Sequence, residues 1–215
     1  MVKKILVCLF VLTIACTTMV FAAEKPVAVH ANHIIQRKAV PDDSPATSVL
    51  LCNNVGPNTN QYGANGYLVA GPASSLGTSQ FIAAPCTPKV SKILTTVKGA
   101  WAYDGSGANR MQVCLYSDSG SNSPGKQIGK CVTKTNLPTF GTANTLVTAN
   151  FTLQNLALTA GTQYWIVAQT PLTGTGDDFY GVWVGESVYL GYNVGQAGWG
   201  SFQPDLEGVM AVRGQ

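Results

Sequence analysis

The feature that most constrains the fold is a pair of cysteines, Cys114 and Cys131, on either side of the strongest turn signal in the chain, SDSGSNSPG. Paired residues in an antiparallel hairpin have a constant sum of residue numbers, so this pair centres a hairpin between Asn122 and Ser123, inside that turn. The flanking runs RMQVCLY and KQIGKCV are both readable as strands. The register therefore favours a disulfide across this hairpin.

That register contains one imperfect pairing, because it places Lys130 opposite Leu115. A β-bulge would relieve the mismatch, and so would a different disulfide connectivity. If the hairpin disulfide forms, Cys52 and Cys86 remain to form a second one by elimination. Four cysteines allow three connectivities, and spacing alone does not separate them.

The N-terminus, MVKKILVCLFVLTIACTTMVFAAE, has the pattern of a secretory signal peptide. Two lysines precede a largely apolar run, and small or apolar residues follow at the positions that a signal peptidase reads. We expect cleavage after Ala22 or Ala23, so that residues 1–23 are the signal. The apolar run is shorter than the roughly 20 residues of a membrane-spanning helix, which disfavours a retained anchor.

Export agrees with the cysteines and the charge of the remaining chain. An even number of cysteines in an exported protein suggests disulfides. A zinc site is disfavoured, because the cysteines form no closely spaced CxxC pair. The chain carries 13 Lys and Arg against 10 Asp and Glu, and loss of Lys3 and Lys4 with the signal leaves 11 against 10. No basic stripe is present, so nucleic acid is not an expected partner. We expect a secreted or periplasmic protein with no membrane span after cleavage.

The mature chain divides into a leader and one domain. Residues 24–47 show little periodicity and are expected to be a flexible or loosely docked leader. Residues 48–215 alternate short apolar runs with Gly-rich turns and have no helical period, which predicts an all-β, antiparallel β-sandwich of jelly-roll type. The expected strands are SVLLCN, GYLVAG, SQFIAAP, SKILTTVKGAWAY, NRMQVCLYS, KQIGKCVTK, TLVTANFTL, TQYWIVAQT, FYGVWVGE, VYLGYNV and EGVMAVRG.

The run TQYWIVAQT is the clearest element. It is almost continuously apolar, and residues 164, 166 and 168 alternate with 165, 167 and 169. This pattern predicts a central strand that is buried on both faces. Trp165, in this run, and Trp183, in another apolar strand, are expected to be core residues.

Several segments in this order resemble uncharacterised bacterial secreted proteins of the choice-of-anchor type: VLLCNNVGPN, QFIAAPCTP, LYSDSGSNSPG, NLPTFG, LTAGTQYWIV and VMAVRG. The resemblance covers roughly residues 48–215. It implies an exported, jelly-roll-like domain and carries no agreed activity. Many members also have a C-terminal sorting tail, whereas this chain stops after its last expected strand, which favours free secretion or periplasmic residence over anchoring.

Aromatic residues give the main indication of a ligand. Tyr192, Trp199 and Phe202 lie in the Gly-rich stretch GYNVGQAGWGSFQP, and Trp101 and Tyr103 precede another turn, YDGSGAN. Exposed flat rings stack on sugar faces, so these residues predict a polysaccharide-binding surface if they meet at one edge of the sandwich. The alternative is that Trp199 covers the open end of the sandwich, since tryptophan is mostly buried.

Catalytic constellations are sparse. Both histidines, His30 and His33, lie in the leader, so catalysis by Ser-His-Asp or Cys-His lacks a base in the folded part, and two histidines are too few for a metal site. Paired carboxylates remain, as glycoside hydrolysis requires. The candidates are Asp205 with Glu207, and Asp177 and Asp178 with Glu186. A polar strand end would also account for Asp205 and Glu207, and a solvated turn would account for Asp177 and Asp178.

No cofactor is predicted, although calcium has candidate ligands. Asp104, Asp177 and Asp178 lie in Gly-rich loops whose carbonyl oxygens can add ligands. Ordinary turn chemistry, in which an aspartate caps its own loop, is the favoured explanation of these residues.

The sequence therefore favours a non-catalytic secreted module that binds extracellular polysaccharide. A carboxylate-dependent glycan hydrolase or lyase is one alternative. A structural matrix or surface component without a small ligand is the other.

Overall fold

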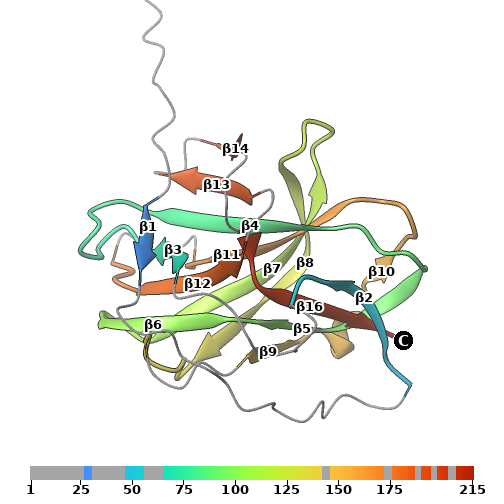
Figure 1. The fold of residues 1–215 in the computed structure, drawn as a ribbon, viewed down its shortest axis with the longest axis horizontal. Helices are drawn as coiled ribbons and strands as arrows, with labels where there is room; N and C mark the ends of the chain where they lie inside the picture. The colour runs from blue at the N-terminus through green and yellow to red at the C-terminus, as the bar shows by residue number, and fades with distance from the viewer. Residues whose placement is uncertain are drawn as a thin grey trace, which may run out of the picture.

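The computed structural model describes residues 27–30, 47–55, 65–141, 146–171, 176–186, 190–194, 198–202 and 207–215. Two antiparallel β-sheets pack against each other, with one short 3-10 helix, η1 (Thr152–Gln154), between strands (Figure 1). The all-β antiparallel sandwich predicted from the sequence is confirmed. Several neighbouring strands are distant in the sequence, as the crossover connections of a jelly-roll-like sandwich require.

The large sheet carries most of the strands. Its main path runs β15 (Glu207–Gly208), β12 (Tyr180–Glu186), β3 (Asn65–Ala70), β4 (Gln80–Cys86), β11 (Tyr164–Gln169), β7 (Arg110–Asp118) and β8 (Pro124–Thr135). Four further strands pair beside this path: β1 (Ala28–His30) with β3, β6 (Trp101–Ser106) with β12, β13 (Leu190–Val194) with β4, and β14 (Gly200–Phe202) with β13.

The small sheet covers one face of the large one. Its path is β10 (Ala157–Leu158), β5 (Lys92–Gly99), β16 (Met210–Gly214) and β2 (Val49–Asn53), and β9 (Val147–Asn150) also pairs with β5. The main core lies between the sheets. It includes Leu94, Val97 and Val212 from the small sheet and Val113, Leu115 and Ile166 from the large one.

Strand β11 has the central position that its apolar run predicted. It pairs with β4 on one side and β7 on the other, and all six of its residues are buried. Ile166 faces the main core, whereas Trp165 and Val167 belong to a separate cluster on the opposite face. Trp165 and Trp183 are both completely buried, as expected.

Two disulfides hold the sandwich. Cys52 and Cys86 join β2 of the small sheet to β4 of the large sheet, and Cys114 and Cys131 join the neighbouring strands β7 and β8. The connectivity favoured by hairpin symmetry is therefore confirmed. One bond links the two layers and the other closes the hairpin.

A β-bulge resolves the mismatch beside the hairpin disulfide. Leu115 pairs with Ile128 instead of Lys130, and the extra residues include Gly129, whose φ of 69° favours glycine. The side chain of Gln154 accepts a hydrogen bond from the Lys130 N–H at 2.7 Å and donates one to the Lys130 carbonyl at 2.8 Å. The bulge thus keeps the cysteines opposite each other and returns Leu115 to a good pairing.

Part of the expected leader is docked, because β1 pairs with β3 and the Gln80 side chain hydrogen-bonds both the N–H and the carbonyl of Val27. One expectation about a strand needs correction. The run SKILTTVKGAWAY is not one strand, because Ala100 separates β5 in the small sheet from β6 in the large sheet.

No helix among the residues placed in the structure is long and apolar enough to cross a membrane. Residues 1–23, expected to be the signal peptide, lie outside the described residues, as does His33.

Candidate functional site

The outer face of the large sheet, which points away from the small sheet, carries its own apolar cluster. Ala83, Cys114, Tyr116, Trp165 and Val167 are buried there, with Cys131 and Trp199 packed against them. Side chains alternate between faces along a strand, so the residues that flank the main-core positions of β7 and β11 produce this second cluster. We call it the outer cluster.

Trp199 lies at the rim of the outer cluster, immediately before β14. It is partly buried, and its ring meets that of Tyr116 edge to face, with 6.1 Å between the centroids and 73° between the planes. Such a T-shaped contact fixes the position of an aromatic ring beyond what burial alone achieves. The indole is thus held in place while part of it remains exposed to solvent.

Tyr116 is anchored from β11. Its hydroxyl donates to Gln169 Oε1 at 3.0 Å, and Gln169, itself 1% exposed, directs its amide nitrogen to Cys131 Sγ at 3.8 Å. Burial raises the pKa of Tyr116 because it disfavours the phenolate, and the hydrogen bond with Gln169 opposes part of that shift. The phenol beneath Trp199 is therefore a neutral, fixed support.

A carboxylate lies beside the outer cluster. Asp118 Oδ1 accepts hydrogen bonds from Trp165 Nε1 at 2.8 Å and Gln163 Nε2 at 3.0 Å, and Oδ2 accepts one from the Gly120 N–H at 2.8 Å. Desolvation acts to raise the pKa of Asp118, but these hydrogen bonds and one from Ser119 outweigh it and hold the pKa below its usual value. Asp118 is thus an oriented, ionised acceptor.

Trp101 and Tyr103 do not join Trp199. Trp101 is 1% exposed and packs in the main core against Trp183, with ring centroids 5.6 Å apart. Its predicted place on a sugar-binding surface is therefore wrong, because strand β6 turns its ring inward. Tyr103 is half-buried near Phe179, and its hydroxyl donates to the Gly107 carbonyl.

Tyr192 and Phe202 can be placed only by their backbone. Tyr192 pairs with Ile82 of β4 and with Gly200 of β14, and Phe202 pairs with Leu190. Their side chains lie outside the described part of the structure, so their membership of the aromatic surface stays a prediction. The hairpin that carries them runs beside β4 at one margin of the large sheet (Figure 1).

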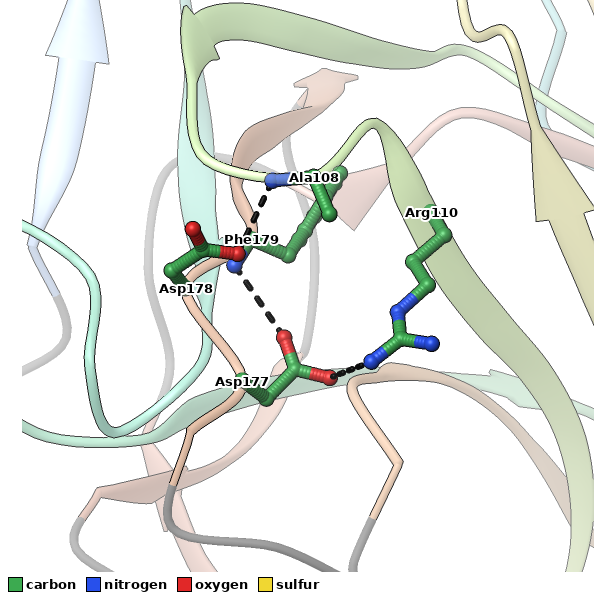
Figure 2. Close-up of polar contacts among 5 residues, drawn as sticks. All are labelled: Ala108, Arg110, Asp177, Asp178 and Phe179. Atoms are coloured by element: carbon green, nitrogen blue, oxygen red, sulfur yellow. Dashed lines mark hydrogen bonds and ion pairs between the residues drawn. The ribbon is translucent and has the colours of Figure 1, made fainter.

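Asp177 and Asp178 tie loops together at one end of the sandwich. Figure 2 shows Asp177 accepting from the Phe179 N–H at 3.1 Å and facing Arg110 at 3.7 Å, while Asp178 accepts from the Ala108 N–H at 2.9 Å. Asp177 is buried, and the guanidinium beside it opposes cation binding. These contacts match the turn-capping alternative.

No described group of three or more His, Cys, Asp or Glu side chains is arranged to hold a metal ion. Asp104, the third calcium candidate, is exposed in β6, immediately after Tyr103. Calcium binding by these aspartates therefore gains no support from their arrangement.

The carboxylate pairs are only partly visible. Glu207 lies opposite Glu186 in the pairing of β15 with β12, but both side chains and all of Asp205 are outside the described residues. A pocket of about 410 Å³ lies beside the inter-sheet disulfide, and the described residues that line it include no carboxylate. Its walls are Leu50, Leu51, Cys52, Asn53, Asn54, Pro85, Cys86, Thr87, Lys89 and Met210.

Sequence reasoning missed most of the residues around Trp199. Tyr116 and Asp118 share the parity of Cys114 on β7, which is a signal that the sequence contained. Gln163 and Gln169 gave no such signal, because a glutamine beside an apolar strand is compatible with any polar edge.

The sequence matches no protein-family model, and no curated protein and no solved structure matches the chain. Its function is therefore argued from its own residues.

Proposed function

We propose that this protein is an exported, non-catalytic β-sandwich module that binds extracellular polysaccharide at the outer face of its large sheet. The observation that carries the proposal is the partly exposed Trp199 ring held edge to face by Tyr116. A fixed aromatic ring at a surface, with polar groups beside it, is the arrangement that stacks on a sugar and hydrogen-bonds its hydroxyls.

Export is supported by two kinds of observation. Two disulfides are typical of proteins outside the reducing cytoplasm. The N-terminal segment has the composition of a signal peptide, and the resemblance to choice-of-anchor proteins implies the same compartment. Membership of that group and a secreted or periplasmic location are parts of the proposal.

A binding role fits this site better than catalysis. Among the described side chains, Asp118 is the carboxylate in hydrogen-bond contact with the outer cluster, and hydrolysis of a glycosidic bond by the usual route needs two carboxylates a few ångströms apart. The Glu186 and Glu207 backbones are paired elsewhere, at the β12–β15 edge, so a hydrolase or lyase remains the alternative to be tested.

The test uses residues 24–215 produced in an oxidising compartment. The protein is incubated with a panel of insoluble polysaccharides, and both its depletion from the supernatant and the release of reducing ends are measured. We expect depletion on at least one polymer without sugar release. We also expect Trp199→Ala to abolish depletion, because it removes the stacking ring.

Leu153→Ala is the matched control. Leu153 is a fully exposed apolar residue in η1, so its truncation removes surface apolar area away from Trp199. It should bind like the wild type. Equal binding by Trp199→Ala and wild type would contradict the proposed site, and release of reducing ends would establish the hydrolase or lyase alternative.

A further inference from the structure

We propose that Asp118 and Asn122 form the polar half of the same site and that its ligand is an uncharged polysaccharide with adjacent free hydroxyls. This inference rests on the proposed function. It assigns hydrogen-bonding residues and a ligand class to the surface beside Trp199.

The position of Asp118 follows from strand geometry. It lies two residues after Tyr116 on β7, so both side chains point to the outer face and their Cα atoms are about 7 Å apart. The Asp118 carboxylate is joined to the outer cluster directly, because the indole of buried Trp165 donates to it. The carboxylate therefore lies on the same face of the large sheet as the aromatic pair, beyond Tyr116 along β7.

The carboxylate is oriented and partly exposed. The side chains of Trp165 and Gln163 and the backbone N–H groups of Gly120 and Ser119 donate to it and hold it in place. Because the residue is partly exposed, its carboxylate is within reach of a hydroxyl donor from a ligand. The lowered pKa keeps this acceptor ionised under ordinary conditions.

Asn122 supplies the complementary donor. The amide nitrogen of Gln163 donates to Asn122 Oδ1 at 3.2 Å as well as to Asp118, so one side chain orients both residues. The Asn122 side-chain nitrogen has no hydrogen-bond partner among the described residues and lies at the exposed hairpin tip. An acceptor and a donor set by one glutamine are suited to two neighbouring hydroxyl groups of a sugar.

The charge of Asp118 selects the ligand class. A uronic acid or sulfated sugar at this place would bring an anion against an ionised carboxylate, and like charges at close range are unfavourable. A neutral sugar can instead donate its hydroxyl to the carboxylate in a charge-assisted hydrogen bond. The geometry therefore favours neutral polymers over anionic ones.

Three variants test the inference. Asp118→Asn removes the charge and keeps the shape. Asn122→Gly removes the amide and retains the φ of 53° that Asn122 adopts, because glycine takes positive φ freely. Ser121→Ala is the control at the same exposed tip, since the described contact of Ser121 is made by its backbone N–H.

Retention is measured on two neutral polymers, cellulose and mannan, and two anionic ones, insoluble alginate and polygalacturonate gels. We expect wild type to bind a neutral polymer, and Asp118→Asn and Asn122→Gly each to weaken that binding about tenfold or more. Ser121→Ala should be unchanged. Asp118→Asn should also improve binding to anionic gels relative to neutral polymers, which a purely structural role of Asp118 would not produce.

The outcomes separate the two proposals. If Trp199→Ala abolishes binding while Asp118→Asn and Asn122→Gly bind like wild type, the polar assignment is overturned and the proposed function stands. Preference of the wild type for anionic gels overturns the ligand class. Failure of the wild type to bind any polymer, with its thermal unfolding cooperative, overturns the proposed function itself.

Discussion

At the scale of single residues, the ionisation of Asp118 matters both for ligand binding at the candidate site and for the stability of the hairpin tip. Its pKa is lower in the folded protein than the usual value of 3.8, so folding favours the ionised form. The stabilisation is complete above that usual value and is lost as the pH falls through the lower, folded-state pKa. The hairpin tip should therefore loosen only in strong acid.

The matched comparison is Asp118→Asn. We expect the wild type to have the higher melting temperature by a constant margin from about pH 5 to 8, and the margin to shrink towards about pH 2. Circular dichroism at a series of pH values measures this. A margin that stays the same at the lowest pH would show that the hydrogen bonds to Asp118 do not depend on its charge.

Asp177 is the residue whose removal should cost most stability among the loop aspartates. Its buried carboxylate accepts from the Phe179 N–H and faces Arg110 (Figure 2). We expect Asp177→Ala to lower the free energy of unfolding by about 1–3 kcal/mol, because it leaves a buried N–H unpaired. Asp178→Ala should cost less, since Asp178 is more exposed. Urea denaturation would contradict this account if the two variants were equal.

Residue environments were only partly predictable. Trp165 and Trp183 lie in long apolar runs, and those runs correctly placed them in the core. Trp101 was misplaced because it precedes a Gly-rich turn, yet strand pairing with β12 sets it opposite Trp183. Whether a ring near a turn points in or out depends on strand register, which local composition does not specify.

At the level of elements, the end of β6 and the turn into β7 depend on two glycines in different surroundings. Gly105 and Gly107 have φ values of 78° and 74°, so both adopt a conformation that disfavours other residues. A Cβ at Gly107 would lie 1.9 Å from the Asp178 carbonyl oxygen, whereas a Cβ at Gly105 would meet nothing within 4 Å.

Alanine substitutions at these two glycines therefore form a matched pair of variants. We expect Gly105→Ala to cost about 1 kcal/mol of unfolding free energy, from backbone strain alone. Gly107→Ala should cost about 3 kcal/mol or more, because the Ala108–Asp178 contact must also move. Equal costs in chemical denaturation would mean that the two loops are not held together as the structure shows.

Element existence was easier to predict than element boundaries. The hairpin register followed from two cysteines and one turn, and even its bulge was one of two stated solutions. The division between β5 and β6 was missed because residues 91–103 carry no strong breaker at Ala100. A chain can pass from one sheet to the other without a turn signal, so such corners depend on tertiary packing.

For the whole molecule, the two disulfides should differ in what they hold. The Cys52–Cys86 bond closes a separation of 34 residues and joins the sheets, whereas the Cys114–Cys131 bond closes 17 within one hairpin. The chain-entropy relation gives about 4 and about 3 kcal/mol for the two. We expect each double Cys→Ala variant to lose stability of this order in urea denaturation. A loss below about 1 kcal/mol for the inter-sheet pair would contradict its role as the link between layers.

The β-sandwich class could be predicted from the sequence pattern, because short apolar runs between Gly-rich turns are compatible with few other folds. The site did not, since it is assembled from β7, β11 and the segment before β14, which are far apart in the chain. Nonlocal strand order brings Trp199 to Tyr116 on the face that also carries Asp118, and no single segment encodes that arrangement.

The most direct test of the account follows the indole N–H signals of the four tryptophans by NMR during titration with a soluble neutral oligosaccharide. Trp101, Trp165 and Trp183 are buried, and Trp199 is the partly exposed one. The account predicts a saturable shift of the Trp199 signal, with a smaller one for Trp165 through Asp118, while the other two stay in place. An unchanged Trp199 signal under conditions where the sugar binds would contradict the proposed site.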